Sequence, residues 1–326
     1  MDTESLFTSI KFSRPCLIIV LFIMIMFGQC QYGYSQEEVQ KVPELNEHVF
    51  LPISSIKAPF TNTTFGMKLG IGSTINLTIP LPEIGDLPIE GIDGNVMFAS
   101  LGLNYSQRIR KRLAMYLKFK MSARIGTDVG SIINLGLNTV TTTQLGWIIN
   151  LLETEKSFLS GTVDLYSYTG LFINVSKFVE DIVNGVPNPS LTDNVPALSA
   201  GIGLRYAYAF SSIFGMKLNG VLSYGESFDR NVTSFRYNLG FAFDANFNEK
   251  HNVPIGLGLS YNLLSNPDII YFSDSFASAG MLKIAYTGSS DFSLGVEASI
   301  LSLPQEDMEK RPIVQLVAFS LIYFFN

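Results

Sequence analysis

The chain has 326 residues, of which 47% are hydrophobic and only 15% are charged, and its formal net charge is −6. Soluble proteins carry about 25% charged residues, and nucleic-acid-binding domains carry clustered Lys and Arg, so both classes fit poorly. No run of about 18 or more apolar residues could cross a bilayer as a helix. Because only helices and closed barrels satisfy every backbone hydrogen bond in lipid, the composition favours an all-β transmembrane barrel, with a soluble all-β protein as the alternative.

The first 35 residues predict a signal peptide that is removed during export. Lys11 and Arg14 precede the apolar run 16–27, whose length suits a signal-peptide core and is too short for a membrane span. Small residues follow this run. Gly33 and Ser35 fit the positions that a signal peptidase reads, which predicts a mature chain beginning at Gln36.

Both cysteines, Cys16 and Cys30, lie in this predicted leader. The mature chain is therefore expected to contain no disulfide and no thiolate metal site. Cys30 leaves open a second type of leader, in which this cysteine is lipidated, although Phe27 and Gln29 replace the residues that such sites favour.

Residues 36–62 form a segment that is first polar and then mixed, and they precede the first alternating stretch. This N-terminal segment is expected either to form a periplasmic tail or to fold into the mouth of the barrel. The barrel itself is predicted to span 63–326.

Period-two alternation is the strongest pattern in the rest of the chain. In the stretch 234–247, aromatic and aliphatic residues such as Phe241 and Phe243 alternate with polar or small residues such as Arg236 and Asp244. One face of such a strand suits lipid and the other suits a water-filled lumen. The same pattern predicts an antiparallel up-and-down barrel of about 12 strands. The predicted strands are 65–79, 95–107, 113–126, 140–153, 156–169, 197–211, 215–228, 232–248, 253–265, 278–288, 290–303 and 312–325.

The lengths of the predicted connections support this assignment. The links after the second, fourth, sixth, eighth and tenth strands are short, whereas most links at the other end are longer, with a short exception around Asp229. Bacterial outer-membrane barrels have short periplasmic turns and longer outside loops. An even number of strands then places both ends of the barrel sequence on the periplasmic side.

The longest predicted loop, 170–196, contains an amphipathic helix near 174–185. Asn174 is a possible N-cap and Gly185 follows the helix. The helix is expected either to pack on the barrel rim or to act as a lid that narrows the lumen. Its apolar stripe consists of Val175, Phe178, Val179, Ile182 and Val183.

The last predicted strand carries an aromatic pattern. It resembles the C-terminal strand that the barrel-assembly machinery recognises in outer-membrane proteins, although Asn326 follows the final aromatic residue. The residues on the matching face are Phe319, Leu321, Tyr323 and Phe325.

Ionisable residues within the predicted strands are expected to face the lumen, because a charge facing lipid at the midplane costs about 2–4 kcal/mol. They either form a salt-bridged network that fills a small lumen or line a narrow path that prefers anions. The predicted lumen-lining residues are Lys118, Lys120, Arg124, Asp164, Arg205, Lys217, Arg236, Asp244, Lys283 and Glu297.

The sequence shows no pattern typical of catalysis. Its two histidines, His48 and His251, are not spaced as metal ligands, and we find no nucleophile elbow, P-loop or dinucleotide fingerprint. We therefore predict no enzyme, no cofactor and no metal site. An outer-membrane lipid-modifying enzyme is the alternative, for which His251 is the candidate base.

The leader, the alternating strands and the aromatic end together resemble transporter-type and porin-type outer-membrane barrels of Gram-negative bacteria. This resemblance implies an outer-membrane location, contact with membrane lipid and assembly by the barrel-assembly machinery. It also implies passive transport of small solutes or hydrophobic compounds, although about 27 residues are few for the N-terminal hatch of fatty-acid transporters. The alternative is a closed structural or binding barrel that acts through its outside loops. No nucleic-acid partner is expected.

Overall fold

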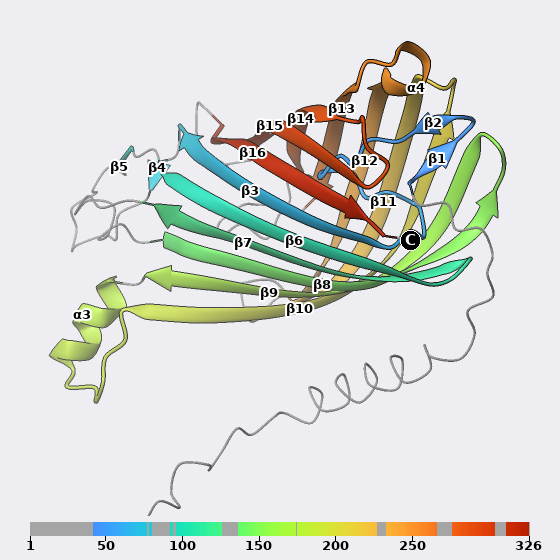
Figure 1. Ribbon diagram of the computed structural model, residues 1–326. Coiled ribbons are helices and arrows are strands. Elements are labelled where there is room, and N and C mark those ends of the chain that lie inside the picture. The colour runs from blue at the N-terminus through green and yellow to red at the C-terminus, as the bar shows by residue number, and fades with distance from the viewer. Residues whose placement is uncertain are drawn as a thin grey trace, which may run out of the picture. The chain divides into compact units, whose positions relative to one another are not determined.

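The structure is a computed structural model of the chain (Figure 1). The predicted leader, its cleavage site and Asn174 lie outside the described residues. Among the residues that are described, no helix is long and apolar enough to cross a membrane. The structure describes residues 42–76, 78–79, 92–93, 96–125, 136–173, 175–226, 233–265, 276–303 and 311–325.

Twelve antiparallel strands form one closed barrel, in which each strand pairs with its neighbours in chain order and β16 pairs with β3 (Figure 1). The prediction of an up-and-down barrel of about 12 strands is confirmed. Two small hairpins lie apart from the barrel sheet: β1 (Glu44–Leu45) with β2 (His48–Val49), and β4 (Thr78–Ile79) with β5 (Ile92–Asp93). The barrel strands are β3 (Thr64–Ile75), β6 (Met97–Arg110), β7 (Leu113–Ile125), β8 (Gly136–Glu153), β9 (Ser157–Ile173), β10 (Thr192–Ala209), β11 (Phe214–Glu226), β12 (Thr233–Asn246), β13 (Ile255–Ser265), β14 (Phe276–Tyr286), β15 (Phe292–Ser302) and β16 (Ile313–Phe324).

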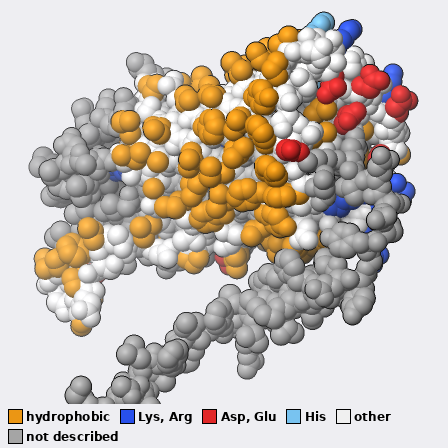
Figure 2. Space-filling view, viewed as in Figure 1, with side chains coloured by type: hydrophobic (Ala, Val, Ile, Leu, Met, Phe, Trp, Pro, Cys, Tyr) orange, Lys and Arg blue, Asp and Glu red, His pale blue; other side chains and the backbone are white. Residues whose placement is uncertain are grey.

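The alternation in the sequence becomes two chemically different faces of the wall. On β12, Phe241 and Phe243 are exposed on the outside, whereas Arg236, Ala242 and Asp244 are buried on the inside. Figure 2 shows the outer side chains as an apolar band across the barrel, with charged residues gathered at one end. An apolar outer band and a polar interior are the arrangement of a barrel in lipid.

The hairpin of β9 and β10 extends further than the sequence indicated. The alternation predicted that these strands end at 169 and begin at 197, but pairing continues to Ile173 and Thr192. Pro196 therefore lies within β10, and not in the loop. The pairing of β10 with β11 begins only at Ser199, so at Pro196 the strand has a neighbour on one side alone. Proline is tolerated in such an edge position.

The predicted loop helix is present as α3 (Val175–Val183), beyond the ends of β9 and β10 (Figure 1). Gly185 has a positive φ of 66°, and the N–H of Val186 donates to the carbonyl of Asp181. This is the glycine-terminated end that the sequence predicted. A second helix, α4 (Asn248–His251), forms the short turn between β12 and β13.

Residues 42–62 of the N-terminal segment pack inside the barrel. Phe50 forms one apolar cluster with Phe158 and small residues of β10, and Leu51, Ile53 and Ile56 form another with residues of β12 and β14. Glycines on the wall make room for these side chains. A Cβ atom added at Gly258, for example, would lie 2.7 Å from Cδ1 of Ile53.

Candidate functional site in the barrel lumen

Three carboxylates of the wall anchor the N-terminal segment, and the first is Asp244 on β12. Its Oδ2 atom lies 3.0 Å from Nε2 of His48 and accepts a hydrogen bond of 2.9 Å from the backbone N–H of Leu51. The Lys217 ammonium lies 3.4 Å from the other oxygen and also donates to the Leu51 carbonyl. His48, Asp244 and Lys217 are all buried. A buried charge is tolerated only when it is paired, so this cluster holds the segment to β11 and β12.

Glu297 on β15 is the second anchor. The backbone N–H of Ser54 donates to it over 3.2 Å, and its Oε2 atom lies 2.7 Å from the Lys68 ammonium. Lys283 lies 3.2 Å from Oε1 and donates to the Pro52 carbonyl over 2.5 Å. Strands β3, β14 and β15 therefore meet the segment at one charged cluster.

Asp164 on β9 is the third anchor. It accepts hydrogen bonds from the hydroxyl of Tyr116 and, over 2.7 Å, from the side-chain amide of Gln144. Arg205 donates to the Tyr116 hydroxyl and, over 3.1 Å, to the carbonyl of Ala58 in the segment.

Lys57 of the segment reaches the same anchor, with its ammonium 3.9 Å from Asp164 and 3.0 Å from the Tyr166 hydroxyl. Burial lowers the pKa of Lys57 to about 8, and Asp164 offsets part of this decrease. Lys57 is therefore charged in neutral solution and loses this charge in mildly alkaline solution.

The anchors account for six of the ten predicted lumen residues: Asp164, Arg205, Lys217, Asp244, Lys283 and Glu297. Arg236 is also buried, with its guanidinium 5.8 Å from the ring centre of Tyr168 and a hydrogen bond to the Glu226 carbonyl.

The remaining three predicted residues, Lys118, Lys120 and Arg124, lie on the inner face of β7 and have a different environment. Lys120 is exposed, and the other two are half-buried. Within the described residues, no carboxylate lies close enough to form an ion pair with any of the three. The lumen charges therefore fall into two groups. Those around the segment form ion pairs or hydrogen bonds with it, whereas the three cations on β7 have no ion-pair partner among the described residues.

The other predicted features fall outside the lumen. Ile182 and Val183 of α3 are exposed, Phe178 is half-buried, and the side chains of Val175 and Val179 lie outside the described residues. The C-terminal aromatic residues point outward: Phe319, Tyr323 and Phe325 are exposed and Leu321 is half-buried.

His251 is exposed in α4, at the short-turn end. Within the described residues, no group of three or more His, Cys, Asp or Glu side chains could hold a metal ion.

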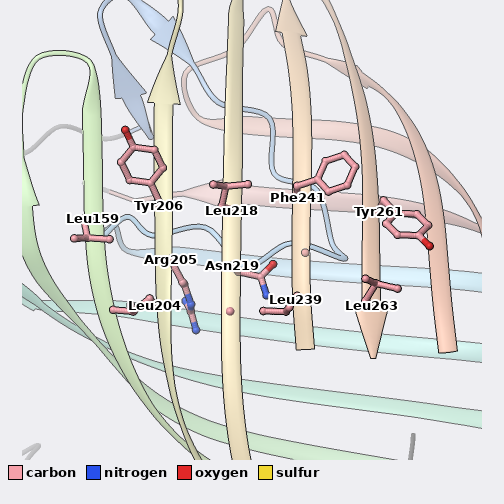
Figure 3. Close-up of a pocket in the computed structure, with 12 residues that line it drawn as sticks. Leu159, Leu204, Arg205, Tyr206, Leu218, Asn219, Leu239, Phe241, Tyr261 and Leu263 are labelled. Atoms are coloured by element: carbon pink, nitrogen blue, oxygen red, sulfur yellow. The ribbon is translucent and has the colours of Figure 1, made fainter. Parts of the chain in front are cut away.

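The outer wall has an apolar depression of about 520 Å³ over β10 to β13 (Figure 3). Leu204 and Leu239 flank Gly220 across the neighbouring strands, and the missing side chain of this glycine leaves the space. Tyr206, Leu218, Phe241 and Tyr261 form the next row of side chains in Figure 3. Because these residues belong to the outer face, the depression opens toward lipid and not toward the lumen.

Several residues of the site were not predicted from the sequence. His48, Ser54 and Lys57 lie in a segment without periodicity, so nothing in the sequence indicated their partners. Lys68 differs, because it alternates with outward-facing Met67 and Leu69 in a predicted strand, and this alternation could have identified it as a lumen residue.

A closed barrel with an apolar outer face and a charged, polar interior defines a transmembrane β-barrel. No family model matches the chain, and no curated protein matches it.

Solved structures with a similar fold include an outer membrane channel from Pseudomonas putida F1, with 12% identity, a TM-score of 0.46, and coverage of 85% of this chain and 100% of that chain. The KdgM porin in complex with disordered oligogalacturonate has 9% identity, a TM-score of 0.44, and coverage of 80% and 99%. A Pseudomonas aeruginosa FadL homologue has 9% identity, a TM-score of 0.43, and coverage of 81% and 91%.

Proposed function

We propose that the protein is an outer-membrane channel for small solutes, and that movement of its N-terminal segment opens the lumen. The observation that carries this proposal is the change in burial along the inner face of β7. Ala114 and Tyr116, near the short turn, are 0% and 2% exposed, whereas Lys120, further along the same face, is exposed. Water therefore reaches one part of the lumen, while the segment fills the part next to the short turns.

The nature of the filling supports a movable closure. A barrel of twelve strands is wider than one of eight, whose inward side chains alone can fill the interior. Here the wall contributes small residues such as Gly240, Gly256 and Gly258, and the segment supplies the side chains that occupy the space. Displacement of the segment would therefore leave a gap, with no change in the wall.

A disulfide between the segment and the wall tests this proposal. The hydroxyl oxygens of Ser55 and Ser260 lie 2.6 Å apart, so Ser55→Cys with Ser260→Cys brings two sulfur atoms within reach of a bond. Cys16 and Cys30 are replaced by serine in every variant, so that no other thiol competes. The refolded barrel is then placed in a planar lipid bilayer and its ion conductance is recorded before and after reduction.

We expect few conducting events while the disulfide is intact and clear steps after addition of a reductant. The single variants Ser55→Cys and Ser260→Cys are the matched controls and should conduct alike in both conditions. Equal conductance of the oxidised and reduced double variant, with the bond verified by mass, would show that displacement of the segment is not the opening step.

A closed barrel that acts through its outside loops is the second candidate, and the filled part of the lumen favours it. Ile182, Val183 and Leu191 expose apolar surface on the hairpin that carries α3. Absence of conductance from folded protein, both oxidised and reduced, would support this candidate over a channel.

A further inference from the structure

The cations of β7, which form no ion pair with any described residue, lie next to the water-accessible part of the lumen. Lys118 and Lys120 are two residues apart, so both side chains point inward from one strand with about 6.7 Å between their Cα atoms. The ammonium of Lys118 lies 5.4 Å from the ring centre of Tyr116, and Lys120 is exposed to the lumen. Two like charges this close repel each other, and an anion placed between them relieves the repulsion.

The neighbouring strands provide polar groups and open space around this pair. Asn104 on β6 lies directly opposite Lys118, and its side-chain amide carries an NH2 group that can donate to an anion. Lys120 lies opposite Gly102 on one side and Thr142 on the other. A Cβ atom added at Gly102 would meet only Lys68 within 4 Å, so the wall is open at this position.

The other lumen cations cannot serve in the same way. Lys217 and Lys283 already neutralise Asp244 and Glu297, and Arg205 holds Tyr116 and the backbone of the segment. Among the described residues, Asp164 is a carboxylate that attracts Lys118 from a distance, and no carboxylate forms an ion pair with Lys118 or Lys120.

We propose that Lys118 and Lys120 form a binding site for the oxyanion group of a small hydrophilic solute, a carboxylate or a phosphate. This inference rests on the proposed channel function and names its substrate class. One ammonium group approaches each side of the oxyanion, and charge-assisted hydrogen bonds of this kind are about twice as strong as neutral ones. Arg124, on the same face toward the end of β7, attracts the anion before it reaches the pair.

The test compares two solutes of the same size that differ in charge. Binding of gluconate and of sorbitol to the detergent-solubilised full chain is measured by calorimetry, with inorganic phosphate as a third probe. The double variant Lys118→Gln with Lys120→Gln is compared with Lys111→Gln with Lys250→Gln, which removes two exposed lysines of the short turns. Folding of each variant is checked by its shift in gel mobility on heating.

We expect wild type and the short-turn variant to bind gluconate and not sorbitol, and the β7 variant to bind gluconate at least about tenfold more weakly. Binding of phosphate without gluconate would assign the site to phosphate-bearing solutes. Equal gluconate affinity in both double variants, or no binding of either anion by wild type, would overturn the proposal. If the β7 variant does not fold, the salt dependence of gluconate binding by wild type decides, because charge-driven binding must weaken between about 0.05 and 0.5 M KCl.

The same variants separate this inference from the channel function. Lysine-dependent gluconate binding by a barrel that never conducts would support the site and refute the channel. A conducting wild type that binds no anion and shows equal permeability to potassium and chloride would support the channel and refute the site.

Discussion

Removal of one charge, at Asp244, tests the proposal that the N-terminal segment closes the lumen. Asp244→Asn preserves the shape of the side chain but leaves the Lys217 ammonium buried with no carboxylate, and it weakens two hydrogen bonds from the segment. Loss of one partner of a buried ion pair costs about 3–5 kcal/mol. Release of the segment would let water reach Lys217, so most of this cost falls on the closed state.

A cost of about 3 kcal/mol raises the ratio of open to closed barrels about 100-fold. The open probability of single barrels in a planar bilayer measures this ratio directly. Glu155→Gln is the matched control, because it removes the same charge from an exposed residue of the short turn between β8 and β9. A folded Asp244→Asn barrel with the open probability of wild type would refute the assignment of this anchor.

Two further predictions concern the packing of the segment and the assembly of the wall. Gly258→Ala places a methyl group 2.7 Å from Ile53, and we expect a destabilisation of the closed state of about 1 kcal/mol and an open probability about fivefold higher. Gly280→Ala, with no atom within 4 Å, should leave the open probability unchanged, and equal effects of the two would contradict the packing argument. Phe325→Ala should lower the yield of folded barrel in membranes about tenfold, because the last outward aromatic residue is lost from the predicted assembly signal. Gln315→Ala, at the other end of β16, is its control, and equal yields would argue against a signal at the C-terminus.

The strands were predictable because their two faces meet different solvents. The residues 234–247 alternate without interruption, and the predicted strand 232–248 agrees with β12 to within about two residues. The extension of β9 to Ile173 was not predictable in this way, because that part of the hairpin has no apolar alternation to mark it. The alternation in the sequence therefore identified the strands of the barrel wall, but it missed the extension of the hairpin of β9 and β10.

The charged site was predictable only in part. The alternation in each strand predicts that the charged side chains of the wall point inward. Their pairing partners could not be predicted, because they lie in distant parts of the chain. Ser54 and Glu297 are 243 residues apart in sequence, and His48 and Asp244 are 196 apart. The segment 42–62 has neither helical nor strand periodicity, so a sequence argument could not decide whether it lies inside or outside the barrel.

The pairing of β16 with β3 has a consequence for the order of folding. These strands are the two ends of the barrel sequence, so the seam between them forms only after some 240 residues have been brought together. Contacts of such long range form slowly. The segment joins β3 directly at Thr64, and the anchoring groups Tyr166, Asp244 and Glu297 lie on β9, β12 and β15. While the seam is open, the segment can reach these partners from the side. After the seam has closed, the segment can enter only through the end of the barrel. The timing of the last pairing therefore decides whether the segment already lies in the lumen when the barrel closes.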